Sequence, residues 1–286
     1  MPPGADPLKE GGGSTAGDPR QALREPTTTV CRTTVTIINS TRSAGRATAA
    51  SNGTQPNAPS ECGRAVESSD NGLIDAARVL QSLAAKRPTF HSEADFQFAF
   101  AWEAKLGSPD LEVRLETHPE PAVRLDLELL DSRSGIGVAI EMKYMTRFWS
   151  GRHGSETFSL KNHGASDLRG YDIVKDIVRV ERFVAARPSW SGLVIVLTNE
   201  ASYWRPRTHG RATNADAFRI SEGTLLAGQR GWGPRTGGTA KGHEAPLQLA
   251  GEYALEWTDY SRLDSSRAGT FRSLTIEIGG TSAVGT

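Results

Sequence analysis

Two short apolar segments of this chain carry charged residues at alternating positions, and this pattern constrains the fold more than any other feature. The first segment covers residues 123–131 and the second residues 136–144, and the connection between them ends in Gly135. Side chains alternate between the two faces of a β-strand. The pattern therefore predicts two strands, each with one apolar face and one charged face, and the short connection predicts that they pair as a hairpin.

The charged face of this hairpin is expected to gather carboxylates and a lysine. Asp126 and Glu128 have the same parity in the first strand, and Glu141 and Lys143 have the same parity in the second. The apolar residues of the first strand are expected together on the other face: Val123, Leu125, Leu127 and Leu129. Carboxylates so placed can hold a hard divalent cation, and a nearby ammonium group can orient a nucleophile or offset phosphate charge.

An amphipathic hairpin with a solvated, charged face would show the same alternation, and a Glu-x-Lys triplet is a weak motif by itself. Lysine is scarce in this chain, however, since only seven of the 33 lysine and arginine residues are lysines. A lysine at this spacing inside an apolar strand therefore favours a functional site over a plain hairpin.

The constellation resembles the PD-(D/E)xK nuclease superfamily. Asp126 stands at the position of the motif aspartate, and Glu141, Met142 and Lys143 stand at the (D/E)xK triplet. The family's proline before the aspartate is replaced by Leu125, as in many members of the family. The resemblance covers residues 90–199.

A segment upstream of the hairpin extends the resemblance. Residues 89–103 look like the family's first helix, which often contributes a glutamate to the metal site, and Glu93 is the matching residue. We expect Asp126, Glu141 and Lys143 to converge in one pocket on a single sheet face, and Glu93 to reach it from the helix that covers that face.

The resemblance implies a metal-dependent endonuclease that hydrolyses phosphodiester bonds of nucleic acid, with DNA as the expected substrate. Asp126 and Glu141 would bind Mg²⁺, or Mn²⁺ as a substitute, with the Met142 backbone carbonyl as a further ligand. Glu93 would complete the shell directly or through water. Lys143 would position the attacking hydroxide or stabilise charge in the transition state.

Three basic residues of the following predicted helix are candidates for phosphate contacts: Arg169, Lys175 and Arg179. Their spacing is equally typical of an ordinary helix surface. The formal net charge of the chain is zero, which argues against a general polyanion-binding surface and leaves two local basic regions, residues 147–169 and 204–241.

Periodicity places further elements along the chain. Helices are expected at residues 71–86, 92–107 and 168–187, and strands at 111–117, 123–131, 136–144, 191–199, 252–260 and 271–278. Residues 147–166 read as an irregular segment and residues 223–242 as a Gly-rich loop. From the second helix to the fourth strand the order is αβββαβ, which is the core order of the restriction endonuclease-like α/β fold. That resemblance implies a central mixed sheet flanked by helices, extended by the C-terminal strands.

Composition divides the chain at about residue 68. Residues 1–68 contain no aromatic residue and are rich in Gly, Pro, Ser and Thr, so we expect a disordered N-terminal segment followed by a nuclease-like domain at residues 69–286. Residues 33–38 are an exception with strand propensity. Because the sequence has neither a secretory leader pattern nor an apolar run of membrane-spanning length, we expect a cytoplasmic protein without a membrane partner.

Two other classes of function remain open. One is a catalytically inactive nuclease fold that serves as a binding or interaction module, in which the charged residues form a structural ion cluster. The other is a glycosidase that uses paired carboxylates, although such an enzyme needs no lysine two residues from its acid.

Overall fold

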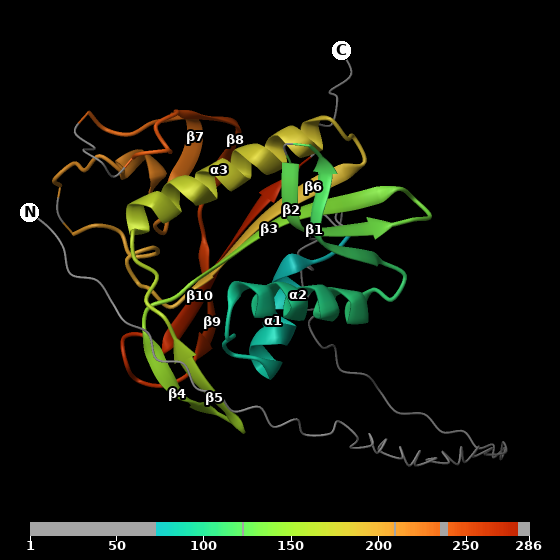
Figure 1. The fold of residues 1–286 in the computed structure, drawn as a ribbon, viewed down its shortest axis with the longest axis horizontal. Helices are drawn as coiled ribbons and strands as arrows, with labels where there is room; N and C mark the ends of the chain where they lie inside the picture. Colours follow the sequence, from blue (N-terminus) through green and yellow to red (C-terminus); the bar gives the residue numbers. More distant parts are fainter. Residues whose placement is uncertain (1–72, 122, 209, 235–239, 280–286) are drawn as a thin grey trace, which may run out of the picture. The chain divides into compact units, whose positions relative to one another are not determined.

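The computed structural model describes residues 73–121, 123–208, 210–234 and 240–279 (Figure 1). The expected disordered segment, residues 1–68, and the strand expected at residues 33–38 lie outside the described residues. The described chain has a mixed α/β architecture built around a central mixed sheet, as the sequence predicts.

Six strands form the central sheet in the order β1-β2-β3-β6-β10-β9. Their bounds are β1 Glu112–Glu120, β2 Val123–Asp131, β3 Ile136–Met145, β6 Trp190–Thr198, β9 Trp257–Arg262 and β10 Thr270–Ile278. β3 and β6 pair in parallel, and all other neighbours pair antiparallel. A parallel pair needs a crossover connection, and the helix α3 (Ser166–Ala185) lies within it.

Helices cover both faces of the sheet (Figure 1). Helix α3 lies across one face, whereas α1 (Ala76–Lys86) and α2 (Glu93–Gly107) lie on the other. Two separate groups of buried apolar residues correspond to these two layers. None of these three helices, which are the α-helices of the described chain, combines the length and apolar character needed to cross a membrane.

Capping and periodicity explain where the helices begin. Ser92 is the N-cap of α2, because its Oγ accepts a hydrogen bond from the backbone N–H of Asp95. The carboxylate of Asp95 in turn accepts from the backbone N–H of His91, which completes a variant of the capping box. α1 begins later than predicted, at Ala76, because the side chain of Asp75 caps it.

One stripe of apolar residues along α3 is buried in the structure. The stripe consists of Ile173, Val174, Ile177 and Val180, each 0% exposed. Phe183 and Val184 continue it in the last turn. β6 has buried side chains on both faces, from Leu193 to Leu197. Burial on both faces explains why its sequence is a continuous apolar run without alternation.

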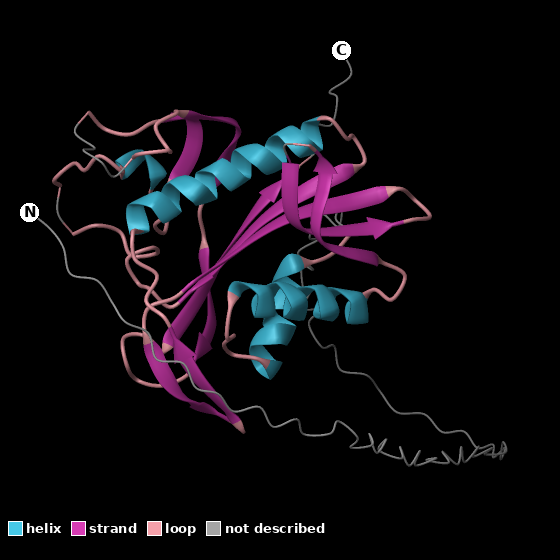
Figure 2. Ribbon diagram, in the orientation of Figure 1, coloured by secondary structure: helices cyan, strands magenta, loops and turns pink. Residues whose placement is uncertain are grey.

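Two small hairpins were not predicted by the sequence pattern, and Figure 2 shows their strands outside the central sheet. β4 (Trp149–His153) and β5 (Glu156–Leu160) pair within the segment that we expected to be irregular. β7 (Leu225–Arg230), in the expected Gly-rich loop, pairs with β8 (Leu247–Ala254). The single strand expected at residues 252–260 is wrong, because the chain divides there into β8 and β9, which belong to different sheets.

The first strand of the candidate site does not alternate regularly along its whole length. Leu127 and Leu129 pack with the apolar group beneath α1 and α2, as expected, but Val123 and Leu125 pack with the group beneath α3. The expectation that all four share one face is therefore wrong. The ladder between β2 and β3 ends at the pair of Leu127 and Ile140, and alternation persists only where pairing is regular.

Candidate active site

The four residues proposed from the sequence line one open cleft of about 450 Å³, at the point where β2 separates from β3. Glu93 enters from the first turn of α2, Asp126 from β2, and Glu141 and Lys143 from β3. Four residues of α3 line the same cleft, and two of them, Asp176 and Arg179, form ion pairs with Lys143 and Glu141. The structure thus brings together all four predicted side chains and adds two that the sequence interpretation did not assign to the centre of the site.

Two of the carboxylates bind the open edge of β3. The backbone N–H of Met142 donates to Asp126 Oδ2 at 2.7 Å, and the backbone N–H of Tyr144 donates to Glu93 Oε2 at 2.9 Å. N–H groups of alternate strand residues point to the same edge, and these two lie beyond the last pair that β3 forms with β2. The carboxylates therefore satisfy backbone donors that would otherwise be buried without a partner.

Glu93 does not reach the site in the way we expected. α2 packs on the sheet face opposite to α3, whereas Glu141 and Lys143 contact residues of α3. The expectation that α2 covers the face of the site is therefore wrong. Glu93 contributes because β2 and β3 have separated, so that a side chain from the α2 layer can reach the open edge of β3.

Lys143 lies at the centre of a buried ion cluster. Its Nζ is 2.9 Å from Asp176 Oδ2, 3.9 Å from Glu141 Oε2 and 4.0 Å from Asp126 Oδ2. Arg179 closes the cluster, because its Nη1 is 2.5 Å from Glu141 Oε1 and its Nη2 is 3.0 Å from Asp176 Oδ1. Glu141 is 1% exposed and Asp176 is 3% exposed, so solvent screens these interactions little.

The cluster contains more carboxyl groups than cationic side chains. Four carboxylates, from Glu93, Asp126, Glu141 and Asp176, face the cations of Lys143 and Arg179. When all six groups are ionised, two negative charges are left without a cation. Burial raises the pKa of Glu141, and the negative charges of Asp176 and Asp126 raise it further, because each of them disfavours another charge nearby.

The same environment acts differently on Glu93 and Lys143. Burial raises the pKa of Glu93, and the attraction of Lys143 and the hydrogen bond from Tyr144 offset this only in part. For Lys143, burial by itself would lower the pKa, but the negative charges of Asp176, Asp126 and Glu93 outweigh it and raise the pKa above its usual value. Lys143 is therefore a charged ammonium group throughout the neutral pH range.

The sequence analysis missed two residues of the cleft, Asp176 and Gln97. Gln97 lies on α2 and is 4% exposed. A signal for Asp176 is present in the pattern of α3. It lies between Ile173 and Val180 on the buried stripe, three residues from one and four from the other. A carboxylate inside an apolar stripe must have a buried partner, and Lys143 is that partner.

The three residues proposed for phosphate contacts differ in their surroundings. Arg179 forms ion pairs with Glu141 and Asp176. Lys175 lines the mouth of the cleft, is exposed, and forms no hydrogen bond or ion pair with another described residue. Arg169 lines a neighbouring pocket and is 3.7 Å from Asp172. Lys175 and Arg169 are thus free to meet an anion, whereas Arg179 supports the cluster.

The arrangement has the donor chemistry of a cation site but does not close around an ion. In the described part of the chain, no three acidic, histidine or cysteine side chains converge closely enough to hold a metal ion. Asp126 and Glu93 each use one oxygen for a backbone N–H, and their other oxygens form no hydrogen bond within the described residues. The Met142 carbonyl accepts from the Lys143 ammonium at 3.3 Å.

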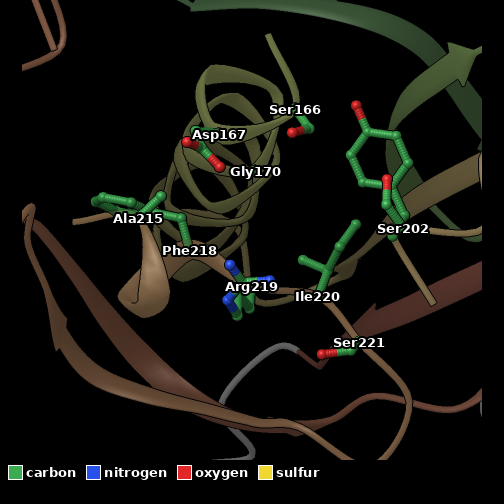
Figure 3. A pocket seen from close by; sticks show the side chains of 10 residues that line it. Ser166, Asp167, Gly170, Ser202, Ala215, Phe218, Arg219, Ile220 and Ser221 are labelled. Atoms are coloured by element: carbon green, nitrogen blue, oxygen red, sulfur yellow. The ribbon is translucent and has the colours of Figure 1, made fainter. Parts of the chain in front are cut away.

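A second pocket, of about 210 Å³, lies at the N-terminal end of α3 (Figure 3). Its only lining carboxylate is Asp167, and its only lining cation, Arg219, is 2.9 Å from Asp216. This pocket therefore lacks the group of carboxylates around a lysine that the cleft has.

Comparisons of the chain with protein-family models, with curated proteins and with solved structures found no match.

Proposed function

We propose that this protein is a metal-dependent nuclease that hydrolyses phosphodiester bonds of nucleic acid, with DNA as the expected substrate. The observation that supports this most is the cluster of Glu93, Asp126, Glu141 and Lys143 around the unpaired edge of β3, at the floor of an open cleft. Charged groups collected at a break in a sheet are costly for stability, and such costs are concentrated at functional sites.

The proposed fold is the restriction endonuclease-like core. The order α2, β1, β2, β3, α3 and β6 supports it, together with an antiparallel β1-β2-β3 meander, a parallel β3–β6 pair and helices on both faces. In this proposal the β4–β5 hairpin is an insertion between β3 and α3, and β9 and β10 extend the sheet beyond β6.

The donor set of the cleft suits a hard divalent cation. All candidate ligands are oxygen atoms, and the cluster contains four carboxyl groups but two cationic side chains, so a bound cation would favour the ionised carboxylates. Asp126 and Glu141 would hold Mg²⁺, or Mn²⁺ as a substitute, and Glu93 and the Met142 carbonyl would contribute further oxygens. Such an ion would lower the pKa of a bound water and screen the scissile phosphate.

The chain's own groups have separate roles in this reaction. Water attacks phosphorus and gives up a proton to solvent, a new P–O bond forms, and the bond to the leaving oxygen breaks as that oxygen takes up a proton from solvent. Because Lys143 stays protonated, it serves as a hydrogen-bond donor to the attacking or non-bridging oxygen and does not serve as a general base. Asp176 is a positioning residue that holds the Lys143 ammonium in place.

Cleavage assays test the proposal directly. Plasmid, linear duplex DNA, single-stranded DNA and RNA would each be incubated with the wild type in Mg²⁺, in Mn²⁺ and in EDTA. We expect cleavage that needs the metal and that Lys143→Ala reduces by at least ~100-fold, the order lost when one transition-state donor is removed. Lys241→Ala is the matched control, because Lys241 is an exposed lysine outside the cleft. Cleavage that Lys143→Ala leaves intact would overturn the proposal.

One observation favours the second candidate, a catalytically inactive binding module. Arg179 is 2.5 Å from Glu141 Oε1, so this carboxylate already has a cationic partner within the protein. In that case no metal would bind, and Glu141→Gln would change the stability of the protein and not any catalytic rate. Metal titration therefore separates the two candidates.

A further inference from the structure

A third pocket, distinct from the one in Figure 3, adjoins the carboxylate cleft and differs from it in the charge of its lining residues. It has a volume of about 370 Å³ and shares Glu93 with the cleft as a common wall. The basic residues that line it are Lys161, His163, Arg169 and His91. Among the described residues that line it, Glu93 is the one with a carboxylate. Glu156, on the β4–β5 hairpin, has its Oε2 atom 3.8 Å from Nε2 of His91.

The backbone holds the basic residues in place beside the end of β3. The Thr146 hydroxyl donates to the Lys161 carbonyl at 2.6 Å, and the Thr146 backbone carbonyl accepts from the backbone N–H of His163 at 2.7 Å. The backbone N–H of Thr146 donates to His163 Nδ1 at 2.9 Å. Three hydrogen bonds thus attach the segment that follows the β4–β5 hairpin to Thr146, the residue directly after the strand that carries Glu141 and Lys143.

This arrangement leaves several donors free. His163 Nδ1 accepts a hydrogen bond, so in the neutral ring the proton is on Nε2, which forms no hydrogen bond within the described residues. The Lys161 ammonium has no hydrogen bond or ion pair with any described residue, and Arg169 has only its 3.7 Å contact with Asp172. Burial and the positive charges of Arg169 and Lys161 lower the pKa of His163, as expected where these three groups lie close together.

Helix geometry relates this pocket to the catalytic cluster. Arg169 and Asp176 are seven residues apart on α3, which is two turns and ~10 Å along the helix axis. Phosphates of one strand of duplex DNA advance ~3.4 Å per nucleotide along the duplex axis. The separation therefore corresponds to about three nucleotides.

We propose that Lys161, His163 and Arg169 form a binding site for a backbone phosphate of the nucleic acid about three nucleotides from the cleaved bond. This inference rests on the proposed nuclease function, and it names the residues that fix the direction in which the substrate leaves the cleft. The substrate extends past Glu93 toward the β4–β5 hairpin, and a substrate that ends at the cleaved phosphate loses this contact.

Binding measurements in EDTA test the site without requiring cleavage. Fluorescence anisotropy would be recorded with labelled duplex and single-stranded DNA over a range of salt concentrations, for the wild type, Lys161→Ala, Arg169→Ala and the double variant. Arg182→Ala is the matched control, because Arg182 is an exposed arginine on the same helix that lines neither pocket. Calorimetry with pyrophosphate would be carried out on the same proteins.

We expect the double variant to bind DNA at least ~10-fold more weakly than the wild type. Its slope of log K against log salt should be smaller by ~0.9 for each lost contact with duplex DNA. Arg182→Ala should match the wild type. An equal loss in Arg182→Ala, or no loss in the double variant, would overturn the site.

The pyrophosphate titration separates this proposal from the nuclease assignment. Pyrophosphate binding that the double variant abolishes, in a protein that neither binds nor cleaves nucleic acid, would support the anion pocket and overturn its assignment to nucleic acid. Cleavage of DNA with unchanged affinity in the double variant would support the nuclease and overturn the flanking phosphate site.

Discussion

Lys143 Nζ lies 2.9 Å from Asp176 Oδ2, an ion pair between the middle strand of the site and the helix that crosses over it. Asp176 is 3% exposed, and Arg179 of the same helix contacts its other oxygen at 3.0 Å. Three charges from two elements are thus held in one buried position. Because an unpaired charge there would be costly, the pair links the orientation of Lys143 to the packing of α3 against the sheet.

Asp176→Asn should lower the cleavage rate ~10–100-fold, the range typical of residues that orient an active-site group without touching the substrate themselves. The substitution keeps the size of the side chain but removes the charge that holds the Lys143 ammonium. Single-turnover cleavage measures the rate, and circular dichroism checks the fold. Asp167→Asn, an exposed position in the first turn of the same helix, is the control. A folded Asp176→Asn protein with the wild-type rate would show that Lys143 needs no such support.

Mg²⁺ and Mn²⁺ should bind the wild type and raise its midpoint of thermal unfolding, because an ion that binds only the folded state stabilises it. Asp126→Asn and Glu141→Gln should each weaken binding, and Ca²⁺ should bind without supporting cleavage. Titration calorimetry gives the affinities. Glu252→Gln, an exposed carboxylate on β8, is the control. Equal affinities in the wild type and in both site variants would contradict the assignment of the ligands.

Gly170→Ala should destabilise the fold by about 1–3 kcal/mol, the usual cost of overpacking. A Cβ atom at this position would lie 2.4 Å from the backbone oxygen of Phe218 in the short helix η1 (Asp216–Phe218), so α3 or η1 must move. The better helix propensity of alanine, worth ~1 kcal/mol at most, does not offset this. Urea unfolding measures the change. Gly164→Ala, where a Cβ atom meets nothing within 4 Å, should be close to neutral.

Tyr144→Phe should lower the free energy of unfolding by about 1–3 kcal/mol, since it leaves buried polar groups without a partner. The Tyr144 hydroxyl donates to the Phe90 carbonyl at 2.9 Å, accepts from the Phe90 N–H at 3.2 Å, and lies 3.0 Å from Thr89 Oγ1. Burial raises the pKa of Tyr144 to about 12, so the hydroxyl keeps its proton at neutral pH.

A double-mutant cycle with Thr89→Val isolates the contact between the two hydroxyl groups. The double variant should lose less stability than the sum of the two single losses, because the two groups share one interaction. Additive losses would show that Thr89 and Tyr144 act independently.

The order of the core elements from α2 to β6, apart from the β4–β5 hairpin, and most of the candidate site could be read from the sequence, for reasons of periodicity. Alternation in β3 predicted that Glu141 and Lys143 share one face, although alternation in β2 is broken around Asp126, and the 3.6-residue period predicted the helix α3. Local chemistry also sufficed for the start of α2, where Ser92 is the cap. In each case the deciding interactions lie within one element or between neighbours along the chain.

Contacts between distant segments set the features that the pattern did not predict. Whether Leu125 packs with Leu127 depends on where β2 stops pairing with β3, and the route of Glu93 into the site depends on the same separation. The partner of Lys143 comes from α3, 33 residues further along the chain, and a linear pattern does not say which element will cover a given face. Local periodicity determines which side chains are buried together on one element, whereas the packing of elements against each other determines which charges meet.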